Sequence, residues 1–119
     1  MFALIVDECD ELRMWLSVLL ATVGYSVQNA KNSLDALTIL KNQKTHFDLL
    51  LTDFYMPIMT GGELIEESIK NKIEIKKIVI LSGHNQDDLR ISDLLARYPN
   101  VEFMNKLAGT QNLLKVISD

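Results

Sequence analysis

The sequence predicts an open α/β sheet of parallel strands, doubly wound with helices on both of its faces. Short apolar runs recur along the chain, and longer segments with helical periodicity lie between them. Most of the apolar runs are nearly continuous rather than alternating, which is typical of strands that are buried on both faces of a parallel sheet. With 119 residues, the chain suits one domain around one core, and we expect residues 1–119 to form it.

The expected elements alternate along the chain. Strands are expected at 2–6, 25–28, 47–51, 78–81 and 101–104, of which the second and the last have the weaker patterns. Apolar residues at helical spacing predict helices at 10–23, 33–42, 61–71, 87–97 and 111–118. The first helix has Asp10 as a candidate N-cap and Gly24 as its stop. The third helix follows Thr60, and Glu63 stands at the spacing of a capping box.

Five strand–helix units predict the topology of the sheet. They cannot close a barrel, which needs eight such units. Right-handed crossovers then give an open (βα)5 sheet, and for this length the common strand order is 2-1-3-4-5, the flavodoxin-like arrangement. In such a sheet, ligands bind outside the carboxyl ends of the strands, next to the first and third strands.

The residues that follow the strands are therefore the candidate site. Asp7 and Glu8 follow the first strand, Asp53 the third, Ser82 ends the fourth, and Lys106 follows the fifth. Crowded carboxylates repel one another, and a divalent cation removes that cost. Oxygen ligands of this kind favour Mg²⁺. A cation, a nucleophilic carboxylate, a lysine and a hydroxyl together suit phosphoryl transfer.

Other ligands and activities of such folds are disfavoured by the same residues. The acidic run after the first strand would repel the phosphate of a flavin or a dinucleotide, and no Walker loop is present. A phosphatase with an aspartate nucleophile would need a second acid two residues after Asp53, where Tyr55 stands. We therefore expect no enzymatic turnover beyond the chain's own phosphorylation and dephosphorylation.

The motifs resemble the receiver domains of two-component response regulators, including the single-domain chemotaxis type. The resemblance covers essentially the whole chain. It rests on Leu4-Ile-Val-Asp-Glu8 with Arg13, on Asp48 through Asp53 and Met56-Pro57 to Gly61 and Leu64, on Val79-Ile-Leu-Ser82-Gly83, and on Lys106.

The resemblance implies a phosphoacceptor site. Asp53 matches the acceptor, and Lys106 matches the lysine that pairs first with the acceptor and then with the phosphoryl oxygens. Glu8 matches the acid that contacts Mg²⁺ directly, Asp7 the acid that acts through water, and the backbone carbonyl of Tyr55 a further ligand.

The resemblance also implies switch and tuning residues. Ser82 matches the hydroxyl that turns toward the phosphoryl group, Gly83 a position that is kept small, and Phe103 the aromatic switch. Tyr55 and His84 occupy the two variable positions that tune dephosphorylation. Because both are bulky enough to screen attacking water, we expect slower loss of phosphate than in a Tyr55→Asn variant.

One residue departs from the family pattern. Proline usually follows the lysine, in a cis peptide, but here the residue is Leu107. A cis bond before a non-proline residue costs about 2.5–4 kcal/mol. We therefore predict a trans bond between Lys106 and Leu107, or a rearranged loop.

The expected biology is a phosphorelay in the cytoplasm. The implied phosphodonor is a sensor histidine kinase or a phosphotransfer protein. The implied output surface is the face formed by 87–97, 101–104 and 111–118, which would bind a downstream protein or a second copy of the chain. The formal charge of −4 argues against direct binding of nucleic acid, and no apolar run is long enough for a membrane span. A degenerate receiver, which binds partners without phosphorylation, is the alternative.

Overall fold

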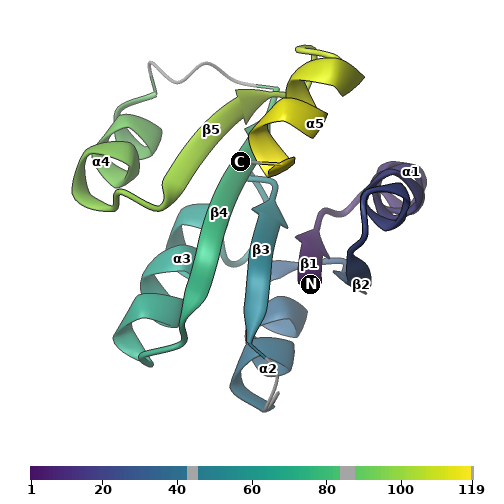
Figure 1. Cartoon of the computed structure of the whole chain (residues 1–119). Coiled ribbons are helices and arrows are strands. Elements are labelled where there is room, and N and C mark those ends of the chain that lie inside the picture. The colour runs from purple at the N-terminus through teal and green to yellow at the C-terminus, as the bar shows by residue number, and fades with distance from the viewer. Residues whose placement is uncertain (43–45, 84–87, 119) are drawn as a thin grey trace.

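The computed structural model describes residues 1–42, 46–83 and 88–118, in which strands and helices alternate (Figure 1). The strands are β1 (Phe2–Val6), β2 (Ser26–Ala30), β3 (Phe47–Thr52), β4 (Ile75–Ser82) and β5 (Val101–Asn105). The helices are α1 (Asp10–Thr22), α2 (Ser33–Asn42), α3 (Gly61–Lys70), α4 (Leu89–Arg97) and α5 (Thr110–Ser118).

The five strands form one parallel sheet in the order β2-β1-β3-β4-β5, which confirms the predicted fold class and strand order. Ala3 in β1 lies opposite Val27 of β2 on one side and Leu49 of β3 on the other. β1 and β3 are therefore interior strands, and their carboxyl ends are neighbours.

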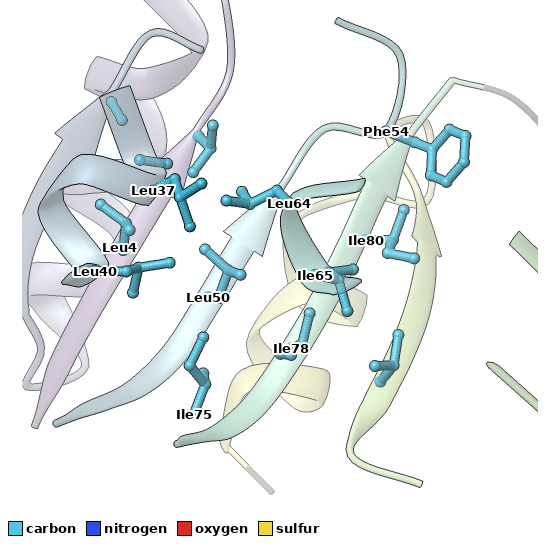
Figure 2. Packing of buried hydrophobic residues seen from close by; sticks show 14 of the residues in the cluster. Leu4, Leu37, Leu40, Leu50, Phe54, Leu64, Ile65, Ile75, Ile78 and Ile80 are labelled. Carbon is cyan, nitrogen blue, oxygen red and sulfur yellow. The ribbon is translucent and has the colours of Figure 1, made fainter. Parts of the chain in front are cut away.

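The helices divide between the two faces of the sheet. Side chains of α2, α3 and α4 pack on one face, and those of α1 and α5 pack on the other (Figure 1). Along β3 the buried side chains alternate, with Leu50 in the first core and Leu49 and Leu51 in the second. Figure 2 shows the first core, in which Phe54 lies at the carboxyl end of the strands, next to the candidate site.

The largest difference from the predicted element boundaries is at the start of β4. β4 begins at Ile75 rather than at residue 78, because Ile75 pairs with Phe47 and the two lysines that follow continue the strand. Lys77 is held in place there, as its Nζ donates to the carbonyl of Val116 at 2.6 Å. The apolar pattern missed this part of the strand because its charged side chains lie at the rim of the sheet.

The helix ends agree in part with the predicted caps. The capping box of Thr60 and Glu63 is present at the start of α3, and Gly24 has a positive φ of 100° after α1, as a stop requires. The prediction of Asp10 as the N-cap of α1 was wrong. Asp10 is the first residue of the helix, and Cys9 occupies the N-cap position, where its side chain forms no capping hydrogen bond. Asp10 instead pairs with Arg13 in the first turn.

In the described part of the chain, no helix is long and apolar enough to cross a membrane.

Candidate functional site

The site lies where β1 and β3 end side by side. The backbone N–H of Asp53 donates to the carbonyl of Val6 at 2.9 Å, which holds Asp53 beside the residue that follows Val6. That residue, Asp7, is only 4% exposed, and its Oδ1 accepts the N–H of Cys9 at 2.9 Å. Two carboxylates from separate strands are thus fixed at one edge of the sheet by backbone hydrogen bonds.

Lys106 joins the two carboxylates. Its Nζ lies 3.0 Å from Oδ2 of Asp7 and 3.4 Å from Oδ2 of Asp53. The backbone N–H of Lys106 donates to the carbonyl of Ser82 at 2.9 Å, which ties the end of β5 to the end of β4. One ammonium group therefore neutralises part of the negative charge of both acids.

The bond between Lys106 and Leu107 is trans, as predicted, since no peptide bond among the described residues is cis. Leu107 points into solvent, with 89% of its surface exposed, and its N–H donates to Oδ1 of Asn105 at 2.8 Å. The loop thus accommodates leucine without moving Lys106 away from Asp7 and Asp53.

The environment of Asp53 opposes its ionisation. Burial raises the pKa of Asp53 above its ordinary value, Lys106 lowers that pKa in part, and the charge of Asp7 raises it again. For Lys106, burial lowers the pKa, but its hydrogen bond to Asp7 and the charge of Asp53 outweigh burial, and the net shift in pKa is upward. The acceptor candidate is therefore a carboxylate whose negative charge is only partly compensated.

Glu8 does not join these groups in the structure. It is exposed at the rim, where it lines a hollow of about 220 Å³ together with Asn32 of the β2–α2 loop and Pro57. Within residues 1–42, 46–83 and 88–118, no three acidic, histidine or cysteine side chains converge as a ready-made metal cluster. The predicted ligands Glu8, Asp7 and Asp53 thus lie around one edge but are not gathered into a cage.

The loop after Asp53 is held by short backbone contacts. The N–H of Phe54 donates to Oδ1 of Asp53 at 2.9 Å, and the N–H of Gly61 donates to the carbonyl of Phe54 at 2.7 Å. A Cβ atom on Gly61 would lie 2.1 Å from the carbonyl oxygen of Asp53, so only glycine fits there. Gly61 thus fixes how the loop returns from the acceptor candidate to α3.

Ser82, Gly83 and Phe103 lie on or next to β4 and β5. Ser82 is 1% exposed at the end of β4, and Gly83 after it faces open space, because a Cβ atom added to it would meet no other atom within 4 Å. Phe103 of β5 is partly buried and packs against the first core. Ser82 is therefore at the site edge, whereas Phe103 stands farther down its strand, before Lys106.

Tyr55 has partners that sequence reasoning missed. Its phenol donates to Oδ2 of Asp88, at the start of α4, and accepts from Arg90 at 3.2 Å. His84, the second predicted tuning residue, lies outside the described residues. An Asp immediately before the periodic run of a helix is a recognisable N-cap signal, and it could have identified Asp88 but not its contact with Tyr55.

The similarity of the chain to known proteins identifies its class. The chain belongs to the response regulator receiver domain family, whose model matches residues 3–118. Receiver domains act in two-component systems, in which they interact with histidine kinases or phosphotransfer proteins, and they are generally not enzymes in the usual sense.

Two curated relatives support the membership. A response regulator receiver protein of Anaeromyxobacter sp. is 35% identical over 85 residues, which are 71% of this chain and 34% of that protein. The sensor kinase CckA of Brucella abortus is 32% identical over 84 residues, which are 71% of this chain and 9% of the kinase. The chain thus spans about a third or less of these relatives.

Solved structures agree on the fold. A receiver domain protein from Clostridium thermocellum has a TM-score of 0.82 and 25% identity, over 98% of this chain and 90% of that one. The response regulator TrrA from Thermotoga maritima, solved in complex with Mg(2+)-BeF, has a TM-score of 0.80 and 26% identity, over 98% and 96% of the two chains.

Proposed function

We propose that this chain accepts a phosphoryl group on Asp53 from a histidine kinase or a phosphotransfer protein, in a Mg²⁺-dependent reaction, and then changes the face that binds its partner. One observation carries the proposal: Asp53 shares the Lys106 ammonium group with the buried Asp7 at the carboxyl edge of the sheet. The side chain of Asp53 remains 14% exposed, so a phosphodonor can reach it.

The chemistry follows from the groups around Asp53. A carboxylate oxygen of Asp53 attacks the phosphorus, an O–P bond forms, and the P–N bond of the donor phosphohistidine breaks, so that the imidazole leaves with its electron pair. Lys106 is placed to neutralise phosphoryl oxygens, since it already reaches Oδ2 of Asp53. The N–H of Phe54 holds the other oxygen, Oδ1, and fixes the orientation of the carboxylate.

The residues at this edge fit Mg²⁺ in their chemistry. All candidate ligands are oxygens, and the acids Asp7, Glu8 and Asp53 carry more negative charge than Lys106 balances. Glu8 and Asp53 would bind the ion directly, Asp7 through water, and Tyr55 through its carbonyl. When bound, the ion would neutralise charge on the transferred phosphoryl group. The likeness to TrrA, which was solved with Mg(2+)-BeF, supports this assignment.

The switch would use residues on β4 and β5. The phosphoryl group adds negative charge at Asp53, toward which the Ser82 hydroxyl and Lys106 would move. We propose that Phe103 follows this movement and that the face of α4, β5 and α5 then binds a downstream protein or a second copy of the chain. Support comes from the position of Ser82 at the end of β4. Its carbonyl accepts the backbone N–H of Lys106, the residue that follows β5.

The first test is the intact mass of the chain after incubation with acetyl phosphate, with and without Mg²⁺. We expect one phosphoryl adduct that needs Mg²⁺, and none on Asp53→Asn. Asp48→Asn is the matched control, because Asp48 lies in the strand that leads to Asp53 but accepts the N–H of Phe2 at the opposite end of that strand. It should retain the adduct.

The other outcomes separate the alternatives. Mg²⁺ binding without an adduct would mean that the acceptor is blocked. Neither binding nor an adduct would favour the phosphorylation-independent interaction module. The sequence supported the interaction module only through Leu107, which stands where the family usually has proline. That support is weakened because Lys106 still contacts Asp7 and Asp53.

A further inference from the structure

Three residues join the acceptor loop to the start of α4. The phenol of Tyr55, two residues after Asp53, donates a hydrogen bond to Oδ2 of Asp88 and accepts one from Nη2 of Arg90 at 3.2 Å. Arg90 closes the cluster, since its Nε lies 3.6 Å from Oδ1 of Asp88. Tyr55 is thus held by charged groups of another element that is far away in the sequence.

Asp88 has two structural tasks at once. Its Oδ1 accepts the backbone N–H of Arg90 at 2.9 Å and so caps α4, while its Oδ2 accepts the phenol of Tyr55. The side chain is only 22% exposed. Hydrogen bonds to a charged, partly buried acceptor are among the stronger ones. The position of the Tyr55 phenol is therefore coupled to the first turn of α4.

The tyrosine ring is held as well as its hydroxyl group. The guanidinium of Arg90 lies 5.2 Å from the centre of the Tyr55 ring and 5.4 Å from that of Phe54. The two rings meet edge to face, with their centres 4.9 Å apart. Because Phe54 is anchored in the core, these contacts leave the Tyr55 ring little freedom to swing.

We propose that Asp88 is a positioning residue for the chemistry at Asp53: its carboxylate fixes the side chain of Tyr55, which stands two residues after the acceptor, and this lengthens the lifetime of the aspartyl phosphate. The inference rests on the proposed function. It adds Asp88 as the residue that allows Tyr55 to slow the loss of the phosphoryl group. A tyrosine that is held in one place excludes water from the acyl phosphate better than one that swings into solvent. Hydrolysis of that bond needs only water, which attacks phosphorus and releases the Asp53 carboxylate and phosphate.

The test compares lifetimes of the phosphoryl adduct, followed by intact mass after acetyl phosphate is removed. Tyr55→Phe keeps the ring but loses the hydrogen bond to Asp88. Asp88→Ser keeps an N-cap, which serine provides well, but is too short to bind the phenol. We expect each variant to lose phosphate about 2- to 10-fold faster than the parent, as for the loss of one hydrogen bond. Tyr55→Asn, which also removes the ring, should be faster still.

The double variant separates positioning from capping. If Asp88 acts through Tyr55, then Asp88→Ser should add nothing in the Tyr55→Phe background. Additive acceleration would mean that Asp88 acts through α4 alone and would overturn the proposal. Parental lifetimes in both single variants would overturn it as well.

A spectroscopic measurement does not depend on phosphorylation. The ¹H–¹³C signals of the Tyr55 ring, assigned by their absence in Tyr55→Phe, should shift in Asp88→Ser, while those of Tyr98, whose hydroxyl contacts Arg97, should not. Unmoved Tyr55 signals would refute the positioning role. If the parent itself forms no adduct, the proposed function fails, yet this measurement still decides whether Asp88 holds Tyr55.

Discussion

At the scale of single residues, Asp53 is more costly to ionise in the folded chain than in the unfolded one. Burial is the main cause, and Lys106 offsets only part of it, so the pKa of Asp53 lies above its ordinary value. The folded chain therefore holds the Asp53 proton more tightly than the unfolded chain. Stability that depends on this proton is present below the ordinary pKa and is lost as the pH rises through the raised value.

Asp53→Asn should consequently raise the melting temperature at pH 7, because asparagine removes the charge. The gain should shrink as the pH falls through the raised pKa of folded Asp53, and it should vanish below the ordinary carboxyl pKa of about 3.9, where Asp53 is protonated in both states. Thermal unfolding in EDTA at several pH values measures this. A loss of stability at pH 7 would contradict the upward direction of the shift.

Gly61 provides a second prediction at this scale. Gly61→Ala would place a methyl group 2.1 Å from the carbonyl oxygen of Asp53, and backbone atoms cannot yield as a flexible side chain can. We expect the free energy of unfolding to fall by about 3 kcal/mol. Gly83→Ala is the control, since its added Cβ meets no atom within 4 Å and should leave stability nearly unchanged. Chemical denaturation compares the two, and equal losses would refute the steric explanation.

The sequence was sufficient for the site residues that stand directly at strand ends. Asp7, Asp53 and Lys106 meet because parallel strands bring their carboxyl ends to one edge. It was insufficient for Asp88, whose contact with Tyr55 depends on where α4 begins in space rather than on any local pattern. The exposed position of Glu8 was also beyond prediction, because rotamers at a rim are not set by packing.

At the scale of elements, α3 ends with a complete Schellman motif that has lysine where glycine is usual. The N–H of Ile73 donates to the carbonyl of Ser68 at 2.9 Å, and that of Lys72 to Ile69 at 3.0 Å. Lys72 therefore has a φ of 57°, in the left-handed region that costs an L-residue roughly 1–2 kcal/mol.

Lys72→Gly should accordingly raise the free energy of unfolding by about 1 kcal/mol. The matched control is Asn71→Gly one residue earlier, where φ is −87° and glycine gives no relief. That variant should be destabilised, since it also loses the bond from Nδ2 of Asn71 to the carbonyl of Glu67. Urea unfolding of both variants checks the sign, and destabilisation by Lys72→Gly would show that the left-handed turn is not strained.

Elements were predictable where their apolar periodicity was complete. The capping box of α3 was evident because Thr60 and Glu63 interact within one turn. The start of β4 was not evident from the sequence. Lys76 and Lys77 belong to the strand because Ile75 pairs with Phe47 and Lys77 with Leu49, and not because they are hydrophobic. The start of α1 at Asp10 was predicted, but its N-cap was misplaced by one residue, because Asp10 pairs with Arg13 inside the first turn and Cys9 is the N-cap.

At the scale of the whole molecule, two cores on opposite faces of the sheet determine the position of the site. Residues of β1 and β3 alternate between these cores, so both strands are held from both sides. Asp7 and Asp53 follow directly after these strands and therefore stand on the most firmly held part of the chain. The alternating strand and helix pattern was enough to predict this arrangement, because right-handed crossovers leave few other topologies.

If Mg²⁺ binds the acidic edge of the sheet as proposed, its binding should also raise the global stability of the chain. An ion that binds only the folded chain raises its stability by about 2.7 kcal/mol at a concentration 100-fold above the dissociation constant, which is a rise in melting temperature of about 10 °C. We expect such a rise with MgCl₂, measured against NaCl at equal ionic strength, because a net charge of −4 also responds to salt alone. Glu8→Gln should reduce the rise, whereas Glu74→Gln, just before β4 at the far end of the sheet, should not. An equal response in the parent and in Glu8→Gln would remove Glu8 from the proposed ligands.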